Sequence, residues 1–293
     1  MKIIKQIGAY FSNTQEMRSK TKNLIYMIGL YYTFSFFLML GCRKLNIGKG
    51  ISTVIVEVLT LVLLFAVYKL VLEEFYFFRF EKRKMALKTF LIFLVITTIK
   101  GAVTISVIDI IYTIKGIENP ILPGTVQDIG TSPATLLCAI IIGPIIEELI
   151  FREAGLTLFT NKDNKLEAII LTSLTFGLMH SNLPQALNAT IGGLIYGYIA
   201  VEYGVRYSIL LHIINNATVY IEYFLNLEVF MYVVSLIGIV FIVIAFGKTF
   251  FKKLKEYSKE NTEYSFKRQM VYFSDISLIL FIAIWSISII LSV

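Results

Sequence analysis

The chain has 293 residues, of which 57% are hydrophobic and 16% are charged. A soluble domain is closer to about half apolar and about a quarter charged, with its charges spread over the whole surface. Here the charges gather between long apolar runs of about 20 residues, which is the length that crosses about 30 Å of hydrocarbon. The composition therefore excludes a soluble globular enzyme, and it also excludes a disordered chain.

The formal net charge is +7, which on its own would also fit a nucleic-acid-binding protein. The basic residues, however, lie in the segments between apolar runs, where the positive-inside rule places them in membrane proteins. We therefore expect the lipid bilayer as a partner and no nucleic acid.

Apolar runs bounded by charged breaks predict nine membrane-spanning helices. They cover residues 23–42, 51–72, 89–113, 133–158, 165–182, 186–203, 206–224, 229–247 and 273–292. The predicted fold is an all-α polytopic membrane helix bundle, with an eight-helix core and an additional ninth span.

These runs divide the chain into four parts. They are an N-terminal tail at 1–22, a membrane-embedded core at 23–247, a basic segment at 248–272 and an additional transmembrane helix at 273–293. The first apolar run has the length of a full span rather than that of a cleavable signal, so we expect it to remain as an anchor.

Charge placement predicts the orientation of the chain. Most Lys and Arg residues fall inside the cell if the tail, the 73–88 loop, the 152–165 loop and the 248–268 segment are cytoplasmic. The prediction is a multi-pass protein of the cell membrane, with a cytoplasmic N-terminus and an extracytoplasmic C-terminus.

Some ionisable residues within the runs have a simple interpretation. Glu57, Glu202 and Glu222 are each interpreted as lying near the end of a span, where a polar head group can reach the interface. Lys100 and Asp109 are nine residues apart, which does not place them on one helical face, so neither is assigned a role.

The fourth run contains two adjacent acids, Glu147 and Glu148, in the stretch GPIIEELIFREAGL. Adjacent side chains diverge by about 100° on a helix, whereas Glu148 and Arg152 share a face and can pair. Gly143 and Pro144 should open or kink the helix just before the acids. One acid is then held by a charge while the other is available. The alternative is a helix end that emerges into the interface with its charges in water.

Both histidines of the chain lie inside apolar runs. Phe176 and His180 are four residues apart on one predicted helix, and His212 and Asn216 are four apart on another. A glutamate and a histidine from different helices can together deprotonate a water that attacks a carbonyl, while imidazole and amide donors stabilise the oxyanion. The sequence places no Ser or Cys beside either histidine in a pattern typical of a covalent nucleophile, so hydrolysis of an amide by water is the preferred reaction.

Together the three motifs, Glu147-Glu148-x-x-x-Arg152, Phe176-x-x-x-His180 and His212-x-x-x-Asn216, resemble the signature of the CAAX protease and bacteriocin-processing family. This Abi-type group of intramembrane peptidases includes the Rce1-like prenyl endopeptidases. The resemblance covers about 140–220 and implies a glutamate-dependent mechanism without a cofactor or metal, in a chamber entered from the cytoplasmic side.

The resemblance also implies roles for the motif residues. Glu147 and His180 would activate the water, His212 and Asn216 would stabilise the oxyanion, and Glu148, Arg152 and Phe176 would organise the site. The substrate would be a membrane-associated peptide or protein, in peptide or bacteriocin processing or in immunity.

Two alternatives remain open. One Glu and two His could hold zinc in a zinc-dependent membrane protease, although the HExxH spacing is missing and Asn216 would be a poor ligand. A non-catalytic immunity or regulatory membrane protein could also retain the motifs as structural hydrogen bonds. A transporter is not favoured, because the chain shows no repeated halves, and Gly193-x-x-x-Gly197 is interpreted as close helix packing.

Overall fold

The computed structural model describes residues 2–71, 83–116, 132–160, 165–180 and 183–225, together with isolated positions between 233 and 286. Within these ranges every regular element is helical. The predicted all-α membrane helix bundle is confirmed.

Each of the first seven predicted spans coincides with a helical segment. The elements are α1 (Lys2–Lys44), α2 (Lys49–Val71), α3 (Leu87–Ile114), α5 (Pro133–Leu137), η1 (Cys138–Ile142), α6 (Gly143–Glu148), η2 (Leu149–Gly155), α7 (Leu156–Phe159), α8 (Lys165–Leu178), α9 (Leu183–Glu202) and α10 (Val205–Leu225). The predicted spans at 229–247 and 273–292 and the segment 248–272 lie mostly outside the described residues.

Four of the described helical segments are long and apolar enough to cross a membrane. They are Gln15–Lys44, Lys49–Ala66, Leu87–Ile114 and Pro133–Phe159. The chain is therefore a multi-pass membrane protein. Helix α8 has only 14 residues, and α9 and α10 carry the Asn, Gly, His and Tyr residues that this region of the sequence contains, so these three helices are not among the four. The count of nine spans stays a prediction.

The segment predicted as an N-terminal tail at 1–22 is helical from Lys2 and continuous with the first predicted span. Helix α1 begins at Lys2 and continues without a break to Lys44. An ion pair between Lys20 and Glu16, with Nζ and Oε1 2.6 Å apart, supports the helix in the polar part, because residues four apart face each other on one side. The first span is therefore the apolar end of a longer helix.

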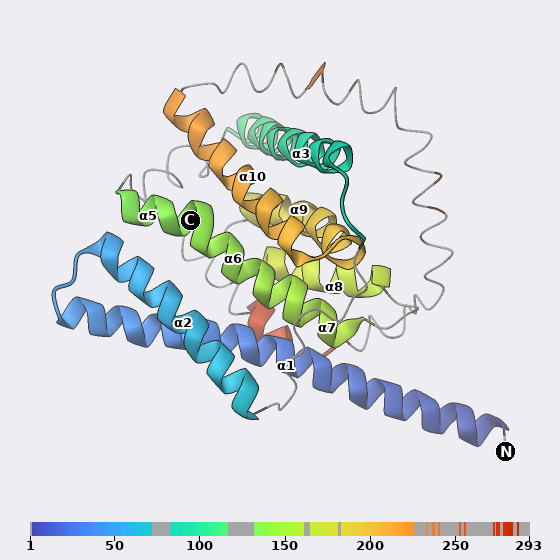
Figure 1. Ribbon diagram of the computed structural model, residues 1–293. Helices are drawn as coiled ribbons and strands as arrows, with labels where there is room; N and C mark the ends of the chain where they lie inside the picture. Colours follow the sequence, from blue (N-terminus) through green and yellow to red (C-terminus); the bar gives the residue numbers. More distant parts are fainter. Residues whose placement is uncertain are drawn as a thin grey trace.

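The segments α5 to α7 form one continuous rod between two groups of helices (Figure 1). On one side α1 and α2 form a hairpin, with α2 packed against α5 and η1, and on the other side α9 packs against α8, α3 and α10. Helix α10 also contacts α6 and η1. The rod thus touches both groups.

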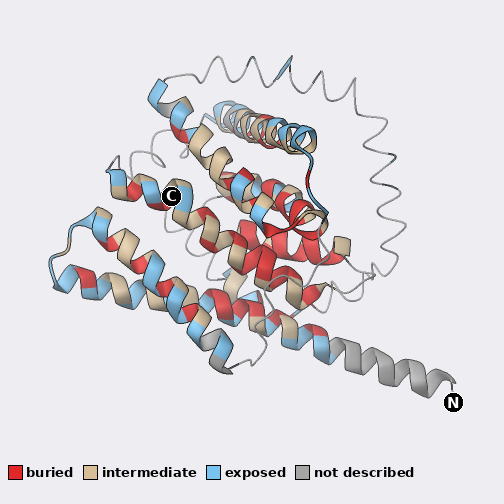
Figure 2. Ribbon diagram, in the orientation of Figure 1, coloured by how far each residue is buried: buried red, intermediate tan, exposed pale blue. Residues whose placement is uncertain are grey.

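Buried residues concentrate on the rod, on α8 and on α9, whereas α1, α2 and α3 are largely exposed (Figure 2). Large apolar side chains account for much of this exposure, among them Phe37, Val62 and Ile110, which are 64%, 56% and 58% exposed. Apolar exposure on this scale is expected of surfaces that contact lipid rather than water.

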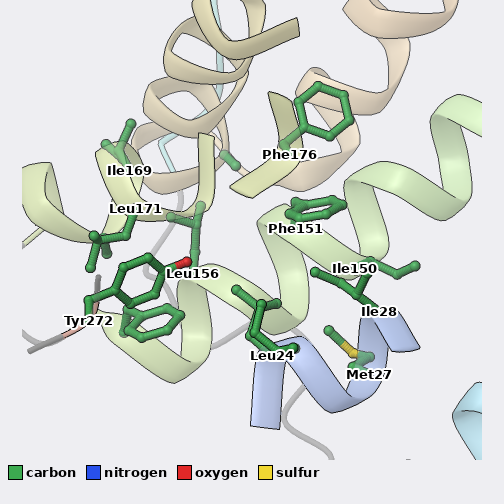
Figure 3. Close-up of a cluster of buried hydrophobic side chains, with 14 of the residues drawn as sticks. Leu24, Met27, Ile28, Ile150, Phe151, Leu156, Ile169, Leu171, Phe176 and Tyr272 are labelled. Atoms are coloured by element: carbon green, nitrogen blue, oxygen red, sulfur yellow. The ribbon is translucent and has the colours of Figure 1, made fainter. Parts of the chain in front are cut away.

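A cluster of buried apolar side chains joins the rod to α1 and α8 (Figure 3). The ring of Phe151 on η2 lies beside that of Phe176 on α8, with centroids 5.2 Å apart. Leu24 and Ile28 approach from α1 and have no exposed surface. Because Phe176 belongs to one of the sequence motifs, this apolar cluster is in direct contact with the candidate site.

Helices α8 and α9 approach each other through glycines, as expected from Gly193-x-x-x-Gly197. A Cβ on Gly197 would stand 2.9 Å from Ile169 Cγ2, and a Cβ on Gly193 would stand 2.9 Å from Ser173 Cβ. Gly177 on α8 is equally enclosed, since its Cβ would collide with Thr190 Oγ1 and would lie 2.7 Å from Ala186 O. Small residues are common where membrane helices pack closely.

We expect Gly177→Ala to destabilise the protein by about 1–3 kcal/mol, because the added methyl group must displace the backbone of α9. Gly101→Ala on α3 is the matched control, since a Cβ there meets nothing within 4 Å. Thermal unfolding of the purified proteins in detergent measures both. Equal melting temperatures for the two variants would contradict the predicted close packing.

Candidate active site

The backbone of the rod departs from α-helical geometry on both sides of the two glutamates. The π-helical turn η1 ends where the Gly143 N–H donates to the carbonyl of Cys138, five residues earlier. Pro144 follows and has no N–H to donate. A second π-helical turn, η2, begins directly after Glu148. The opening expected at Gly143 and Pro144 is therefore a pair of widened turns, a feature that is frequent at functional sites.

Glu148 is fully enclosed and held by two partners. Its side chain has no exposed surface, Nδ1 of His212 donates to its Oε1 at 3.1 Å, and Arg152 Nε lies 3.4 Å from its Oε2. The predicted pairing of Glu148 with Arg152 is confirmed. A buried carboxylate requires such partners, because an isolated buried charge is costly.

Glu147 is the more accessible of the two acids. Its side chain is 31% exposed, and its Oε2 lies 3.6 Å from Nε2 of His212, which is too long for a direct hydrogen bond. His212 therefore faces Glu148 through one ring nitrogen and Glu147 through the other. One acid is fixed and the other is available, as the sequence predicts.

His180 follows α8 at its C-terminal turn and is held by the same helix. Its Nδ1 donates to the carbonyl of Phe176 at 3.1 Å. The Phe176 ring meets His180 and His212 edge-on, with centroid distances of 5.1 Å and 6.0 Å. Phe176 thus contacts both histidines and brings two of the motifs together.

Asn216 lies one turn after His212 on α10, and its amide donates to the carbonyl of Ala139 at 3.0 Å. In an α-helix that carbonyl would accept from Gly143, but the Gly143 N–H bonds Cys138 instead. The next N–H along the chain is missing, because residue 144 is proline. Asn216 therefore supplies the donor that the π-helical turn lacks, a contact that the sequence does not predict, and its second amide N–H is available for another acceptor.

Two aromatic contacts complete the site. The Tyr196 ring on α9 stacks on His212, with centroids 4.9 Å apart and an angle of 21° between the planes. The Arg152 guanidinium lies over the Phe176 ring, 4.3 Å from its centroid. Tyr196 is only 2% exposed, and sequence reasoning missed it. The signal available was the four-residue spacing between Asn188, Gly192 and Tyr196 in turn, which places all three on one face of α9.

The interpretation of Glu57 as a residue at the end of a span is wrong. It occupies the interior of α2, and its Oε2 accepts a hydrogen bond from the Tyr31 hydroxyl of α1 at 2.9 Å. Glutamate is too short to reach the interface from this depth, so it bonds within the bundle instead. Glu202, by contrast, ends α9 and lies 3.5 Å from Lys165 Nζ, as expected of a residue near a span end.

The zinc alternative concerns Glu147, His180 and His212. Among the side chains that the structure describes, no group of three His, Cys, Asp or Glu residues is arranged to hold a metal ion. Glu148 and His212 instead engage each other directly.

The part of the chain that contains these residues is similar to a known protein family. Residues 129–218 match the family described as type II CAAX prenyl endopeptidase Rce1-like. The chain carries an Rce1-like region. The resemblance to the CAAX protease and bacteriocin-processing family is confirmed, and this region contains all three motifs. No curated protein and no solved structure matches the chain.

The matched family is one of prenyl endopeptidases, and the match covers residues 129–218 rather than the whole chain. It runs from the start of the rod to α10 and includes α8 and α9. Helices α1, α2 and α3 lie outside it. The hydrogen bond between Tyr31 and Glu57 therefore lies outside the region that matches the family.

We expect Arg152→Met to lower the free energy of unfolding by about 3–5 kcal/mol, because it leaves Glu148 buried without its cation. The double variant Glu148→Gln/Arg152→Met should regain much of this stability, since it removes both charges. Chemical or thermal unfolding in detergent measures the three proteins. If the loss of unfolding free energy in the double variant equals the sum of the losses from the two single changes, the two side chains do not stabilise each other.

Proposed function

We propose that this protein is an intramembrane endopeptidase that hydrolyses a peptide bond of a membrane-associated peptide or protein with a water activated by Glu147 and His180. The observation that carries the proposal is the contrast between the two adjacent acids. Glu148 is sealed and anchors His212, whereas Glu147 is accessible and faces the other nitrogen of the same ring.

The proposed base is Glu147, assisted by His180. The Nδ1–H of His180 is donated to a backbone carbonyl, so Nε2 is the nitrogen that can accept a hydrogen bond from the attacking water and orient it toward Glu147. Glu147 takes one proton from the attacking water as the new C–O bond forms. It then returns that proton to the nitrogen of the scissile amide as the C–N bond breaks.

The proposed oxyanion donors are His212 and Asn216. Glu148 accepts a hydrogen bond from Nδ1 of His212 and fixes the ring, and the imidazolium form of His212 would donate through Nε2 to the oxygen of the tetrahedral intermediate. Asn216 has one N–H on Ala139 O and one that remains for the same oxygen. Arg152 pairs with Glu148 and Phe176 contacts both histidines, so we propose that these residues position the site without touching the substrate.

The proposed location is the cell membrane, with the N-terminus in the cytoplasm and the chamber open to that side. The proposed role is in peptide or bacteriocin processing or in immunity. The support is the family match together with the lipid-type exposure of α1, α2 and α3.

Glu147→Gln and His180→Ala should each reduce cleavage by about 10²–10⁴-fold, because each removes a participant in proton transfer. Comparative peptidomics of membranes from cells that carry each variant measures the loss. Glu202→Gln is the matched control, since Glu202 pairs with Lys165 at the end of α9.

The peptides that accumulate only in the Glu147→Gln and His180→Ala cells identify the substrates. If both variants remain in the membrane and give the wild-type peptide profile, the chain is a non-catalytic immunity or regulatory protein.

Full activity is expected after exhaustive treatment with EDTA and 1,10-phenanthroline, because the proposed base and donors are all side chains of this protein. The assay is cleavage of an identified peptide in detergent before and after chelation. Loss of activity that added Zn²⁺ restores would favour the zinc-dependent alternative.

A further inference from the structure

Lys100 is an ionisable residue in the interior of a membrane-spanning helix. It is the fourteenth of the 28 residues of α3, so it lies roughly 20 Å of helix rise from either end. A lysine side chain cannot reach the interface across that distance. Charged residues at such depth usually face the protein interior and mark functional sites.

The partners of Lys100 are neutral. Its Nζ donates to Asn188 Oδ1 at 2.8 Å and lies 3.5 Å from the Asn188 carbonyl oxygen. None of the ion pairs among the described residues includes Lys100. The ammonium group therefore has polar support but no counter-charge in the part of the chain that the structure describes.

Lys100 also lies next to the candidate active site. Helices α3 and α10 both pack on α9 (Figure 1). The four-residue spacing of Asn188, Gly192 and Tyr196 places them along one face of α9. The Nζ of Lys100 and Cε2 of Tyr196 lie 3.2 Å and 3.5 Å from the point where a Cβ on Gly192 would stand. Since Tyr196 stacks on His212, one aromatic ring connects the ammonium group to the proposed oxyanion donor.

We propose that Lys100 binds a carboxylate of the peptide substrate, a few residues from the bond that is cleaved. This inference rests on the proposed peptidase function and names a feature of its substrate. Arg152 is the other cation beside the site, but it is 2% exposed and paired with Glu148. Lys100 is only partly buried, and its ammonium lies so close to Gly192 that a Cβ there would stand 3.2 Å from Nζ.

The carboxylate has two possible sources, which are the C-terminus of the peptide and an Asp or Glu side chain. Each provides the charge that the ammonium lacks, and each would exchange bulk water for a charge-assisted hydrogen bond. Substrates without a carboxylate near the cleaved bond would leave Lys100 unpaired and would bind less tightly.

Binding in the Glu147→Gln background tests the inference without turnover. The full-length protein is placed in lipid nanodiscs, and fluorescein-labelled apolar peptides are supplied with a free C-terminal carboxylate or with a carboxamide. A third set has a carboxamide end and an internal Glu, with Gln in the matched peptide. We expect one carboxylate set to bind at least 10-fold more tightly than its neutral partner.

Lys100→Gln should abolish this preference, and Lys100→Arg should retain most of it because the charge remains. Asn188→Ala is the matched control, since it removes the helix contact of Lys100 but keeps the ammonium. A preference that survives in Lys100→Gln, or is absent from all sets with Lys100 intact, would overturn the inference. So would equal losses in Lys100→Gln and Asn188→Ala, which would indicate a purely structural role.

Turnover separates this inference from the proposed function. In the wild-type background, Lys100→Gln should raise KM for the preferred carboxylate peptides at least 10-fold and leave kcat nearly unchanged, because the contact is made equally in the ground state and the transition state. A Lys100-dependent preference in a protein that cleaves no peptide would refute the peptidase and leave the carboxylate site in place.

Discussion

The buried charge of Glu148 is the constraint on which the site depends. A carboxylate with no exposed surface is tolerated only with partners, and here the partners come from its own rod and from α10. Arg152 supplies the opposite charge to Glu148, and His212 donates a hydrogen bond to its other carboxylate oxygen. Because His212 is thereby held, its second nitrogen is aimed at Glu147, and the geometry of the proposed chemistry follows from the need to pair one buried acid.

The need to pair every buried polar group also explains the contacts of the π-helical backbone in the rod. Pro144 removes one donor and the π-helical turn redirects another, so the carbonyl of Ala139 needs a partner from outside the helix. Asn216 provides it from α10, on the same face as His212. An irregular backbone within a membrane requires such compensation, because no water is present in the hydrocarbon to supply it. The distortion and the motif residue are therefore parts of one arrangement.

The Rce1-like region supplies the acids, the histidines and the asparagine, while the rest of the chain surrounds them. From α1 and α2, Tyr31 and Glu57 form a hydrogen-bonded pair. From α3, Lys100 approaches the opposite side through Asn188 and Gly192 of α9. The residues proposed for the reaction therefore lie in the Rce1-like region. Helices α1, α2 and α3, which lie outside it, carry side chains that could help to select a particular peptide.

The sequence by itself determined the helices, because hydrocarbon requires long uninterrupted apolar runs, and seven of the predicted runs coincide with helical segments. It also determined the pairing of Glu148 with Arg152, since a spacing of four residues places both on one face. Only the tertiary structure decided which way Glu57, Lys100 and Tyr196 face, and that His212 bridges the two acids. Those contacts join helices that are far apart in the chain, and helical periodicity says nothing about which neighbour a polar side chain will meet.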